Sequence, residues 1–254
     1  MLDDLKGMRA LITGSSTGIG AAVAKAYAAH GMRVIVHYKS SEAEANAVVA
    51  EIRAAGGEAH ALKADVSDSA ATEDLVGKAA EKLGGLDVLV NNAGALVKRT
   101  PIGEVDDAFF DSVVDLNVRS VVMASKAALP HLKQSGHSSV INLSSVAARN
   151  GGGPGSSLYA SSKAFVLNLT RGMAKEFLPF GIRVNAVSPG VIMTPFHERY
   201  STPQQIEAMR QTIPMGRVGT PQENVGAFLF FASPSMSGYV TGQTLEVNGG
   251  QFMV

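Results

Sequence analysis

Hydrophobic positions recur along this chain with two different periods. Short runs rich in Val and Ile alternate with longer, Ala-rich stretches in which apolar residues return at helical spacing. The pattern predicts strands at 8–12, 33–38, 58–63, 87–91, 139–144 and 182–188. It predicts helices at about 18–30, 41–55, 68–83 and 158–179, and a long helical region that ends near 134.

The order of these elements indicates the fold class. Strands alternate with helices, and glycines lie at the joints (Gly31, Gly56, Gly84 and Gly181). Such alternation is typical of βαβ units, whose parallel strands form a sheet with helices on both faces. We therefore expect an α/β protein with a doubly wound sheet. Without a linker or a repeat in the chain, residues 1–254 are expected to form a single domain.

Two segments interrupt the alternation. Residues 151–157 read GGGPGSS and predict a loop. The stretch between Pro195 and Pro221 follows the carboxyl end of a predicted strand and has a short helical pattern centred on 204–211. Because ligands bind at the carboxyl ends of strands in open α/β sheets, we expect this insertion, at about 194–220, to be a substrate lid.

Composition and charge exclude several classes of function. Hydrophobic residues make up 46% and charged residues 17%, which is typical of a folded globular protein. The 22 basic and 22 acidic residues cancel, so a nucleic-acid partner is not expected. The absence of cysteine excludes disulfides and thiolate metal sites, and no histidines have metal-ligand spacing. An acidic start and the lack of an apolar run of about 20 residues predict a cytoplasmic protein without a membrane partner.

A glycine-rich turn joins the first predicted strand to the first helix. Glycines allow the chain to turn tightly against a pyrophosphate, and the free N–H groups of a helix N-terminus bind anions. The spacing is one residue wider than the usual dinucleotide fingerprint, and no Lys follows, so an NTPase loop does not fit. The alternative is a purely structural turn. The residues expected to bind the cofactor here are Gly14, Ser16, Thr17, Gly18, Ile19 and Gly20.

The end of the second predicted strand bears on the choice of nicotinamide cofactor. An acidic residue at this position would bind the ribose 2′-hydroxyl of NAD. The chain instead has Tyr38, Lys39 and Ser40, with no carboxylate before Glu42. Lys39 and the serine hydroxyls can hold a 2′-phosphate. We therefore expect NADP to be preferred and NAD to be the alternative, unless Lys39 is an ordinary solvated loop residue.

Tyr159 and Lys163 are four residues apart in a predicted helix, so they share one face. A phenol with a pKa near 10 is a poor proton shuttle at neutral pH, and a nearby ammonium would lower that pKa. Such a pair often occurs by chance. Here, however, two serines, Ser144 and Ser145, end the strand that precedes the helix. A hydroxyl at that place can polarise a substrate carbonyl next to the tyrosine.

From the first strand almost to the C-terminus, the chain resembles the short-chain dehydrogenases/reductases of about 250 residues. It is similar to 3-oxoacyl-[acyl-carrier-protein] reductases and glucose dehydrogenases of this family. The resemblance rests on short motifs in a fixed order: Thr13-Gly14-x-x-x-Gly18-Ile19-Gly20, Asp65-Val66, Asn91-Asn92-Ala93-Gly94, Asn117, Ser144-Ser145, Tyr159-x-x-x-Lys163, Asn185-x-x-x-Pro189-Gly190, and the ending from Thr241-Gly242-Gln243 to Asn248-Gly249-Gly250.

The resemblance implies a Rossmann-type domain with a seven-stranded parallel sheet, assembled as a homotetramer. It also implies a catalytic tetrad: Asn117 would anchor a water, Ser145 would orient the carbonyl, and Tyr159 would exchange the proton. Lys163 would hold the nicotinamide ribose and tune Tyr159, and Ser144 is the alternative catalytic serine. Further cofactor contacts are implied at Asp65, Val66, Asn92, Ala93, Gly94, Pro189, Gly190, Ile192 and Thr194.

Three functions agree with these features to different degrees. The first is an NAD(P)-dependent oxidoreductase that acts on a small carbonyl or alcohol, such as a sugar, a polyol or a keto acid derivative. The second is a 3-oxoacyl-[acyl-carrier-protein] reductase, ranked lower because Phe180 stands where such reductases would have a basic residue. The third is a cofactor-binding sensor without turnover, which the presence of both Tyr159 and Lys163 disfavours.

Overall fold

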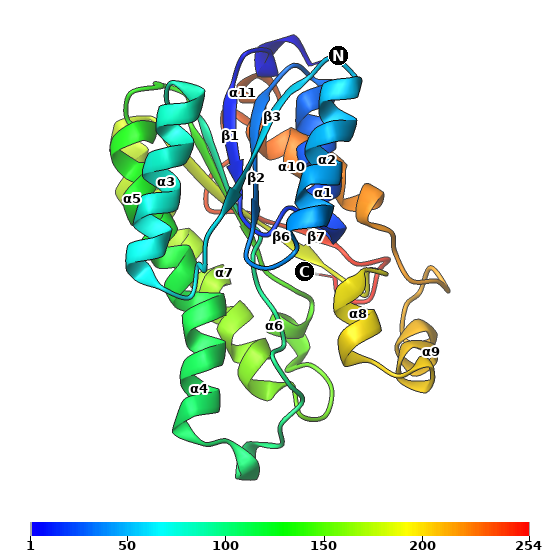
Figure 1. The fold of residues 1–254 in the computed structure, drawn as a ribbon. Helices are drawn as coiled ribbons and strands as arrows, with labels where there is room; N and C mark the ends of the chain where they lie inside the picture. The colour runs from blue at the N-terminus through cyan, green and yellow to red at the C-terminus, as the bar shows by residue number, and fades with distance from the viewer. Residues whose placement is uncertain (1, 254) are drawn as a thin grey trace.

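The computed structural model describes residues 2–253. Seven parallel strands form one sheet in the order β3-β2-β1-β4-β5-β6-β7, as expected for a Rossmann-type fold (Figure 1). The strand order reverses between β1 and β4, which is the point where ligands bind in such sheets. The strands are β1 (Arg9–Ile12), β2 (Arg33–Tyr38), β3 (Glu58–Lys63), β4 (Val88–Asn91), β5 (Ser139–Leu143), β6 (Arg183–Pro189) and β7 (Thr244–Val247).

Helices cover both faces of the sheet and give it two apolar cores. On one face lie α1 (Gly18–Ala29), α2 (Glu42–Ala54) and α10 (Pro221–Ala232). On the other lie α3 (Ser69–Leu83), α5 (Ser120–Leu132) and α7 (Ser157–Phe177). Alternate strand residues point to opposite sides, so Ile12 packs with the first group and Leu11 with the second. This burial on both sides explains why the strands read as continuous hydrophobic runs.

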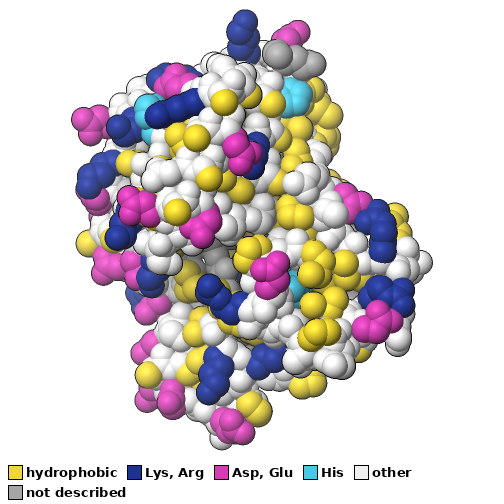
Figure 2. All heavy atoms as spheres, turned by 45° about the vertical axis from the view of Figure 1, so that its right-hand side comes forward, with side chains coloured by type: hydrophobic (Ala, Val, Ile, Leu, Met, Phe, Trp, Pro, Cys, Tyr) yellow, Lys and Arg dark blue, Asp and Glu magenta, His cyan; other side chains and the backbone are white. Residues whose placement is uncertain are grey.

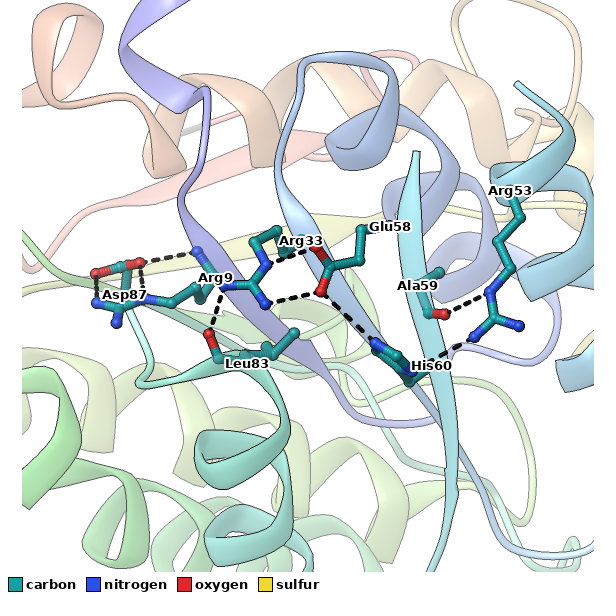
Figure 3. A network of polar contacts seen from close by, with 8 residues as sticks. All are labelled: Arg9, Arg33, Arg53, Glu58, Ala59, His60, Leu83 and Asp87. Atoms are coloured by element: carbon teal, nitrogen blue, oxygen red, sulfur yellow. Dashed lines mark hydrogen bonds and ion pairs between the residues drawn. The ribbon is translucent and has the colours of Figure 1, made fainter. Parts of the chain in front are cut away.

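Charged side chains form ion pairs at the amino-terminal ends of strands β1, β2 and β3. Arg9 in β1 is opposite Arg33 in β2, and Arg33 is opposite Glu58 in β3. Asp87 binds Arg9 through both carboxylate oxygens at 2.7 Å, and Glu58 binds Arg33 at 2.7 and 2.8 Å (Figure 3). Each carboxylate thus neutralises one of two adjacent cations. These pairs lie at the opposite end of the strands from the glycine-rich turn.

Most predicted elements agree with the structure to within two residues at each end. The strands at 33–38 and 58–63 have the predicted bounds, and Asp68, predicted as the first residue of a helix, is the N-cap of α3. The long helical region is in fact two helices, α4 (Asp107–Val114) and α5, joined by a π-helical turn at Asp115–Arg119. The pattern alone did not predict α10 or β7.

The remaining helices lie near the carboxyl ends of the strands or at the C-terminal side of the chain. A short helix, α6 (Ala147–Asn150), follows β5 and leads into the predicted loop. The predicted insertion contains α8 (Pro195–Tyr200) and α9 (Pro203–Gln211), which lie beside one another beyond the sheet (Figure 1). The last helix is α11 (Pro234–Ser237). Within residues 2–253, no helix is both long enough and apolar enough to cross a membrane.

Candidate active site

A cavity of about 640 Å³ opens where the strands end, between the glycine-rich turn and the insertion. Figure 2 shows a hollow on this side of the molecule, bordered by basic and hydrophobic side chains. Most residues that we predicted for the site line the cavity: Gly14, Ser16, Thr17, Gly18, Ile19, Tyr38, Lys39, Asp65, Val66, Asn92, Ala93, Gly94, Ser145, Tyr159, Lys163, Pro189, Gly190, Ile192 and Thr194.

Three predicted residues do not line it. Ser40 is exposed beyond the end of β2. Gly20 is buried inside α1, where an added Cβ would lie 2.6 Å from both the Gly14 carbonyl oxygen and Asn92 Nδ2, so it supports the turn from behind. Asn117 is fully buried behind the cavity wall. The cavity lining therefore does not include these three residues, and the water-anchoring role expected of Asn117 stays a prediction.

The glycine-rich turn is held by close backbone packing. Gly14 has a φ of +62°. A Cβ on this residue would lie 2.9 Å from Ala93 Cα, so only glycine fits. The N-cap of α1, Thr17, makes no capping hydrogen bond through its side chain, and no acidic residue lies in the first turn. The free N–H groups and the positive end of the helix dipole therefore face the cavity without a competing anion.

A histidine that we did not assign to the site ties this turn to the sheet. His37 Nδ1 accepts a hydrogen bond from the Gly14 N–H at 2.8 Å, and Nε2 contacts the Ala64 carbonyl at 3.2 Å. These partners fix one neutral tautomer, with the proton on Nε2. Burial lowers the pKa of His37 to about 4, so the ring stays neutral at physiological pH. In the sequence, its position two residues before Lys39 could have indicated that His37 lies near the cofactor site.

Thr13 and Asn92 connect the turn to the end of β4. The Thr13 hydroxyl accepts hydrogen bonds from the N–H groups of Asn92 and Ala93, each at 3.0 Å. The Asn92 amide donates to the carbonyls of Thr13 and Gly14 at 2.8 Å. The motif residues on either side of the sheet reversal thus form one rigid wall of the cavity.

Lys39 and Asp65 form an ion pair at one end of the cavity, with 2.6 Å between Nζ and Oδ2. Both side chains are partly exposed. Burial acts to raise the pKa of Asp65, but hydrogen bonds from Lys39 and Ser67 outweigh it, so the pKa is lowered. The cation that we expected to meet a 2′-phosphate therefore already has a carboxylate partner.

These features fit a dinucleotide. The same cavity is lined by Lys39 and Asp65, by the free N-terminus of α1, and by Tyr159 and Lys163. Anion-binding N–H groups suit a pyrophosphate, and the flanking polar groups suit two riboses. Among residues 2–253, no group of three His, Asp or Glu side chains is placed to hold a metal ion.

At the other end of the cavity, the geometry distinguishes the two adjacent serines. The Ser144 hydroxyl is buried and donates to the Lys163 main-chain carbonyl at 2.9 Å. The Ser145 side chain instead faces the Tyr159 phenol and accepts a hydrogen bond from the Ala147 N–H at 3.1 Å. The proton of Ser144 is thus committed to the helix, and Ser145 is the serine that faces the phenol.

The pKa of Tyr159 differs from the expectation that Lys163 would lower it. Burial raises it to about 12, and only the nearby Ser145 hydroxyl acts in the opposite direction. Burial disfavours the phenolate more than these neighbours favour it. Tyr159 is consequently a protonated phenol at neutral pH, ready to donate its proton.

Lys163 lies one helical turn from Tyr159 and is only 2% exposed. Its Nζ donates to the Leu143 carbonyl at 2.9 Å. Burial lowers the pKa of this lysine to about 8. A Cβ on Gly94 would lie 3.0 Å from the same Nζ, so a glycine on the opposite wall makes room for the ammonium. The ammonium is therefore confined between α7 and the end of β4.

Asn117 lies in the π-helical turn between α4 and α5. Its Oδ1 accepts from the Ala95 N–H at 3.1 Å, and its Nδ2 donates to the carbonyls of Ala95 and Val113 at 2.9 and 3.0 Å. Both Nδ2 hydrogens and one acceptor site of Oδ1 thus hold the segment after β4. π-Turns of this kind are frequent at functional sites.

The insertion contributes aromatic residues that the sequence did not single out. The Phe196 ring lies 5.7 Å from that of Tyr159 and 5.0 Å from that of Tyr200, measured between centroids. Arg99, after β4, also lines the cavity and contacts the insertion. His197 and Met209 of the insertion also line it. Nothing in the local sequence of Arg99 signals this, because its partners are far along the chain.

Comparison with known proteins extends over nearly the whole chain. A family model described as Enoyl-(Acyl carrier protein) reductase matches residues 14–251. A 3-oxoacyl-[acyl-carrier-protein] reductase from Synechocystis sp. is 40% identical over 244 residues, which are 96% of each chain.

Two solved structures are also similar. One is an NADH-dependent reductase responsible for alginate metabolism, with 44% identity, a TM-score of 0.91 and coverage of 99% of this chain and 100% of the other. The other is a short-chain dehydrogenase from Burkholderia cenocepacia in complex with NADP, with 36% identity, a TM-score of 0.91 and coverage of 98% and 99%. The relatives thus include proteins named for NADH and for NADP.

Proposed function

Because the chain belongs to the short-chain dehydrogenase/reductase family and is an NAD(P)-dependent oxidoreductase, we propose a specific reaction for it. The protein reduces the carbonyl group of a small polar metabolite, and Tyr159 is the proton donor. The single observation that carries the proposal is the arrangement of Ser145, Tyr159 and Lys163 on one wall of the cavity. These are the groups that carbonyl reduction requires next to a nicotinamide.

Each side chain has a separate task in this reaction. Tyr159 is protonated and donates to the carbonyl oxygen, where negative charge develops. Ser145, which faces the phenol, donates to the same oxygen and orients it. Lys163, with one hydrogen bond used on Leu143, has donors left for a ribose hydroxyl. A bound nicotinamide cofactor supplies the hydride in reduction and accepts it in oxidation.

We further propose that NADPH is preferred over NADH. Residues 38–40 at the end of β2 include no carboxylate, and Lys39 lines the cavity there with Asp65 as its partner. A phosphate would replace Asp65 as the partner of the Lys39 ammonium. The alternative, preference for NADH, is supported by the existing pair between Lys39 and Asp65 and by the NADH-dependent relative.

The proposed substrate is a sugar, polyol or keto acid derivative. The relative responsible for alginate metabolism supports a substrate derived from a carbohydrate. A second candidate function is reduction of a 3-oxoacyl group on acyl carrier protein, favoured by the 40% identical relative of that name. The exposed Phe180, in place of a basic residue, is a reason to rank it second.

Assembly as a homotetramer is also part of the proposal. Phe110 in α4 and Phe165 in α7 are each 46% exposed, which is unusual for phenylalanine and supports their burial between copies of the chain. Light scattering on the purified protein measures the mass directly. A sensor without turnover remains the least supported function, because both Tyr159 and Lys163 line the cavity.

Titration of NADPH and NADH against the wild type, Lys39→Ala and Asp65→Asn tests the cofactor proposal. We expect tighter NADPH binding by the wild type, a loss of the preference in Lys39→Ala and a gain in Asp65→Asn, which frees Lys39 and removes a negative charge. Lys63→Ala, at an exposed position outside the cavity, is the control. Equal or tighter NADH binding by the wild type, unchanged in Lys39→Ala, contradicts the NADPH preference. Failure of both cofactors to bind contradicts the function itself.

A further inference from the structure

Arg99 connects the insertion to the glycine-rich loop at the substrate end of the cavity. Its Nε donates to the Tyr200 carbonyl at the end of α8 at 2.9 Å, and its Nη1 donates to the Pro154 carbonyl at 3.0 Å. These two bonds fix the plane of the guanidinium, and no contact within the described residues uses Nη2. An arginine held in this way is preorganised to bind a further acceptor.

The backbone before Arg99 is shaped to deliver it there. Val97 has a φ of +66°, a conformation that β-branched residues rarely adopt. The Lys98 N–H donates to the Leu96 carbonyl at 2.9 Å across this residue, forming a three-residue turn. The turn leaves Leu96 and Arg99 in the cavity wall and Lys98 exposed. The Thr100 N–H then binds the Gly155 carbonyl at 2.9 Å.

The charge of Arg99 is not neutralised by the protein. No described carboxylate forms an ion pair with Arg99. Lys39, another cation of the cavity wall, is instead paired with Asp65. The remaining charged residue of the wall, Lys163, is also a cation. Burial lowers the pKa of His197, and the charge of Arg99 lowers it further, so His197 adds no second positive charge. The substrate half of the cavity is therefore positive and contains no carboxylate.

We propose that Arg99 binds a carboxylate of the substrate, at several atoms' distance from the carbonyl group that is reduced. Arginine binds carboxylates with charge-assisted hydrogen bonds, and a half-buried unpaired guanidinium gains most from such a partner. The separation follows from the short helix α8: Phe196 in its first turn contacts the Tyr159 ring, whereas Arg99 is bonded to the carbonyl of Tyr200 at its last residue. The substrate class is thus an oxo acid or sugar acid whose two functional groups are not adjacent.

This inference rests on the proposed reductase function, so its first test is binding and does not need turnover. Isothermal calorimetry compares D-glucuronate with D-glucuronamide, its neutral counterpart, on the protein with saturating reduced cofactor and on the protein alone. For the wild type, we expect the acid to bind about tenfold or more tightly than the amide. Arg99→Gln should bind both alike, Arg99→Lys should keep part of the preference, and Lys98→Gln should behave as the wild type.

The second test is turnover of acids and their methyl esters. Pyruvate has adjacent groups, whereas levulinate has two carbons between them. We expect levulinate to be reduced with a lower KM than methyl levulinate, a smaller difference for the pyruvate pair, and no acid preference in Arg99→Gln. Equal acid and neutral binding by the wild type, or an unchanged acid preference in Arg99→Gln, overturns the inference. Absence of turnover with every compound overturns the reductase function, while the calorimetry still decides the role of Arg99.

Discussion

The ammonium nitrogen of Lys163 lies 5.9 Å from the centre of the Tyr159 ring, one turn away on the same helix. Burial moves the two pKa values toward protonated Tyr159 and toward a less strongly protonated Lys163, to about 12 and about 8. Below pH 8 the phenol therefore has its proton and the lysine has its charge. This combination suits proton donation to a carbonyl oxygen.

Replacing Lys163 by methionine should separate stability from activity. Lowering its pKa from 10.5 to about 8 means that keeping the lysine charged costs roughly 3 kcal/mol at pH 7. We expect Lys163→Met to unfold at higher urea concentration than the wild type. The gain in unfolding free energy should be roughly 1–3 kcal/mol, less than the full cost of the buried charge, because the hydrogen bond to Leu143 is lost at the same time. Carbonyl reduction should fall at least about 100-fold.

The pH dependence of this effect has a definite sign. Between about pH 8 and 10.5 the unfolded lysine binds a proton that the native lysine does not, so its contribution makes wild-type stability rise with pH in this range. In Lys163→Met that contribution is absent. Lys175→Met, at an exposed position of the same helix, is the control. Loss of stability in Lys163→Met at pH 7 would show that the native lysine is not penalised by burial.

Gly94→Ala should impair the site without unfolding the protein. The added Cβ would lie 2.8 Å from Asn117 Oδ1 and 3.0 Å from Lys163 Nζ, so both groups must move. Displacements of this size next to reacting groups cost about tenfold to a hundredfold in rate. Gly103→Ala is the matched control, because nothing lies within 4 Å of its added Cβ. Steady-state kinetics on both variants checks this, and equal rates would mean that the cavity wall is not closely fitted.

His37 should make the protein less stable in mild acid. Its pKa is lowered from 6.5 to about 4, so the unfolded chain binds a proton in this range that the native ring refuses. Unfolding free energy should therefore fall by roughly 3 kcal/mol as the pH decreases from 6.5 to 4. In His37→Asn, whose amide can still accept from Gly14, this part of the decrease should vanish. Urea unfolding at a series of pH values measures it, and parallel curves for both proteins would refute it.

The pair of Arg9 and Asp87 should stabilise the sheet more than a surface pair. The Asp87 side chain is 6% exposed, and Asp87→Asn leaves Arg9 without its counter-charge. We expect a loss of roughly 3 kcal/mol. Asp74→Asn removes a pair with Lys78 whose side chains are 58 and 60% exposed, and should cost less than about 1 kcal/mol. Similar losses in the two variants would contradict this assignment.

The same carboxylate should contribute to acid unfolding. Burial acts to raise the pKa of Asp87, but the hydrogen bonds and the charge of Arg9 outweigh it, so the native pKa lies below 3.8. A lowered carboxyl pKa stabilises the native state above the unfolded value, and this stabilisation is lost as the pH falls through the native one. Acid titration of the wild type against Asp87→Asn shows the difference.

The hydrophobic pattern predicted six of the seven strands and the cofactor turn, because these depend on local sequence. Strands such as 33–38 are continuous apolar runs, and Gly14 stands where only glycine fits. Boundaries shifted where a residue caps a helix, as Asp68 does by accepting from the Ala71 N–H. The π-turn at Asn117 has no pattern of its own, because its hydrogen bonds depend on Ala95 in another segment.

The pKa shifts and the contacts between residues far apart in the sequence could not be predicted in the same way. The lowering of the Tyr159 pKa was inferred from Lys163 alone, whereas burial in the folded site decides its direction. The partner of Lys39, Asp65, follows another strand, so the pair could not be inferred from the residues around Lys39. Arg99 is bonded to Tyr200 and Pro154, which are 101 and 55 positions away in the sequence. These contacts exist only in the folded protein, so the sequence around Arg99 could not indicate its place in the cavity wall.

The central claim is that Tyr159 donates the proton during carbonyl reduction. The most direct measurement is single-turnover oxidation of bound NADPH by a ketone substrate, such as levulinate, in the wild type and in Tyr159→Phe, followed by nicotinamide absorbance. The phenylalanine keeps the ring and its packing on Phe196 but has no proton to give. We predict unchanged cofactor affinity and a rate lower by about a thousandfold or more. A variant that binds NADPH and reduces the carbonyl at nearly the wild-type rate would contradict the claim.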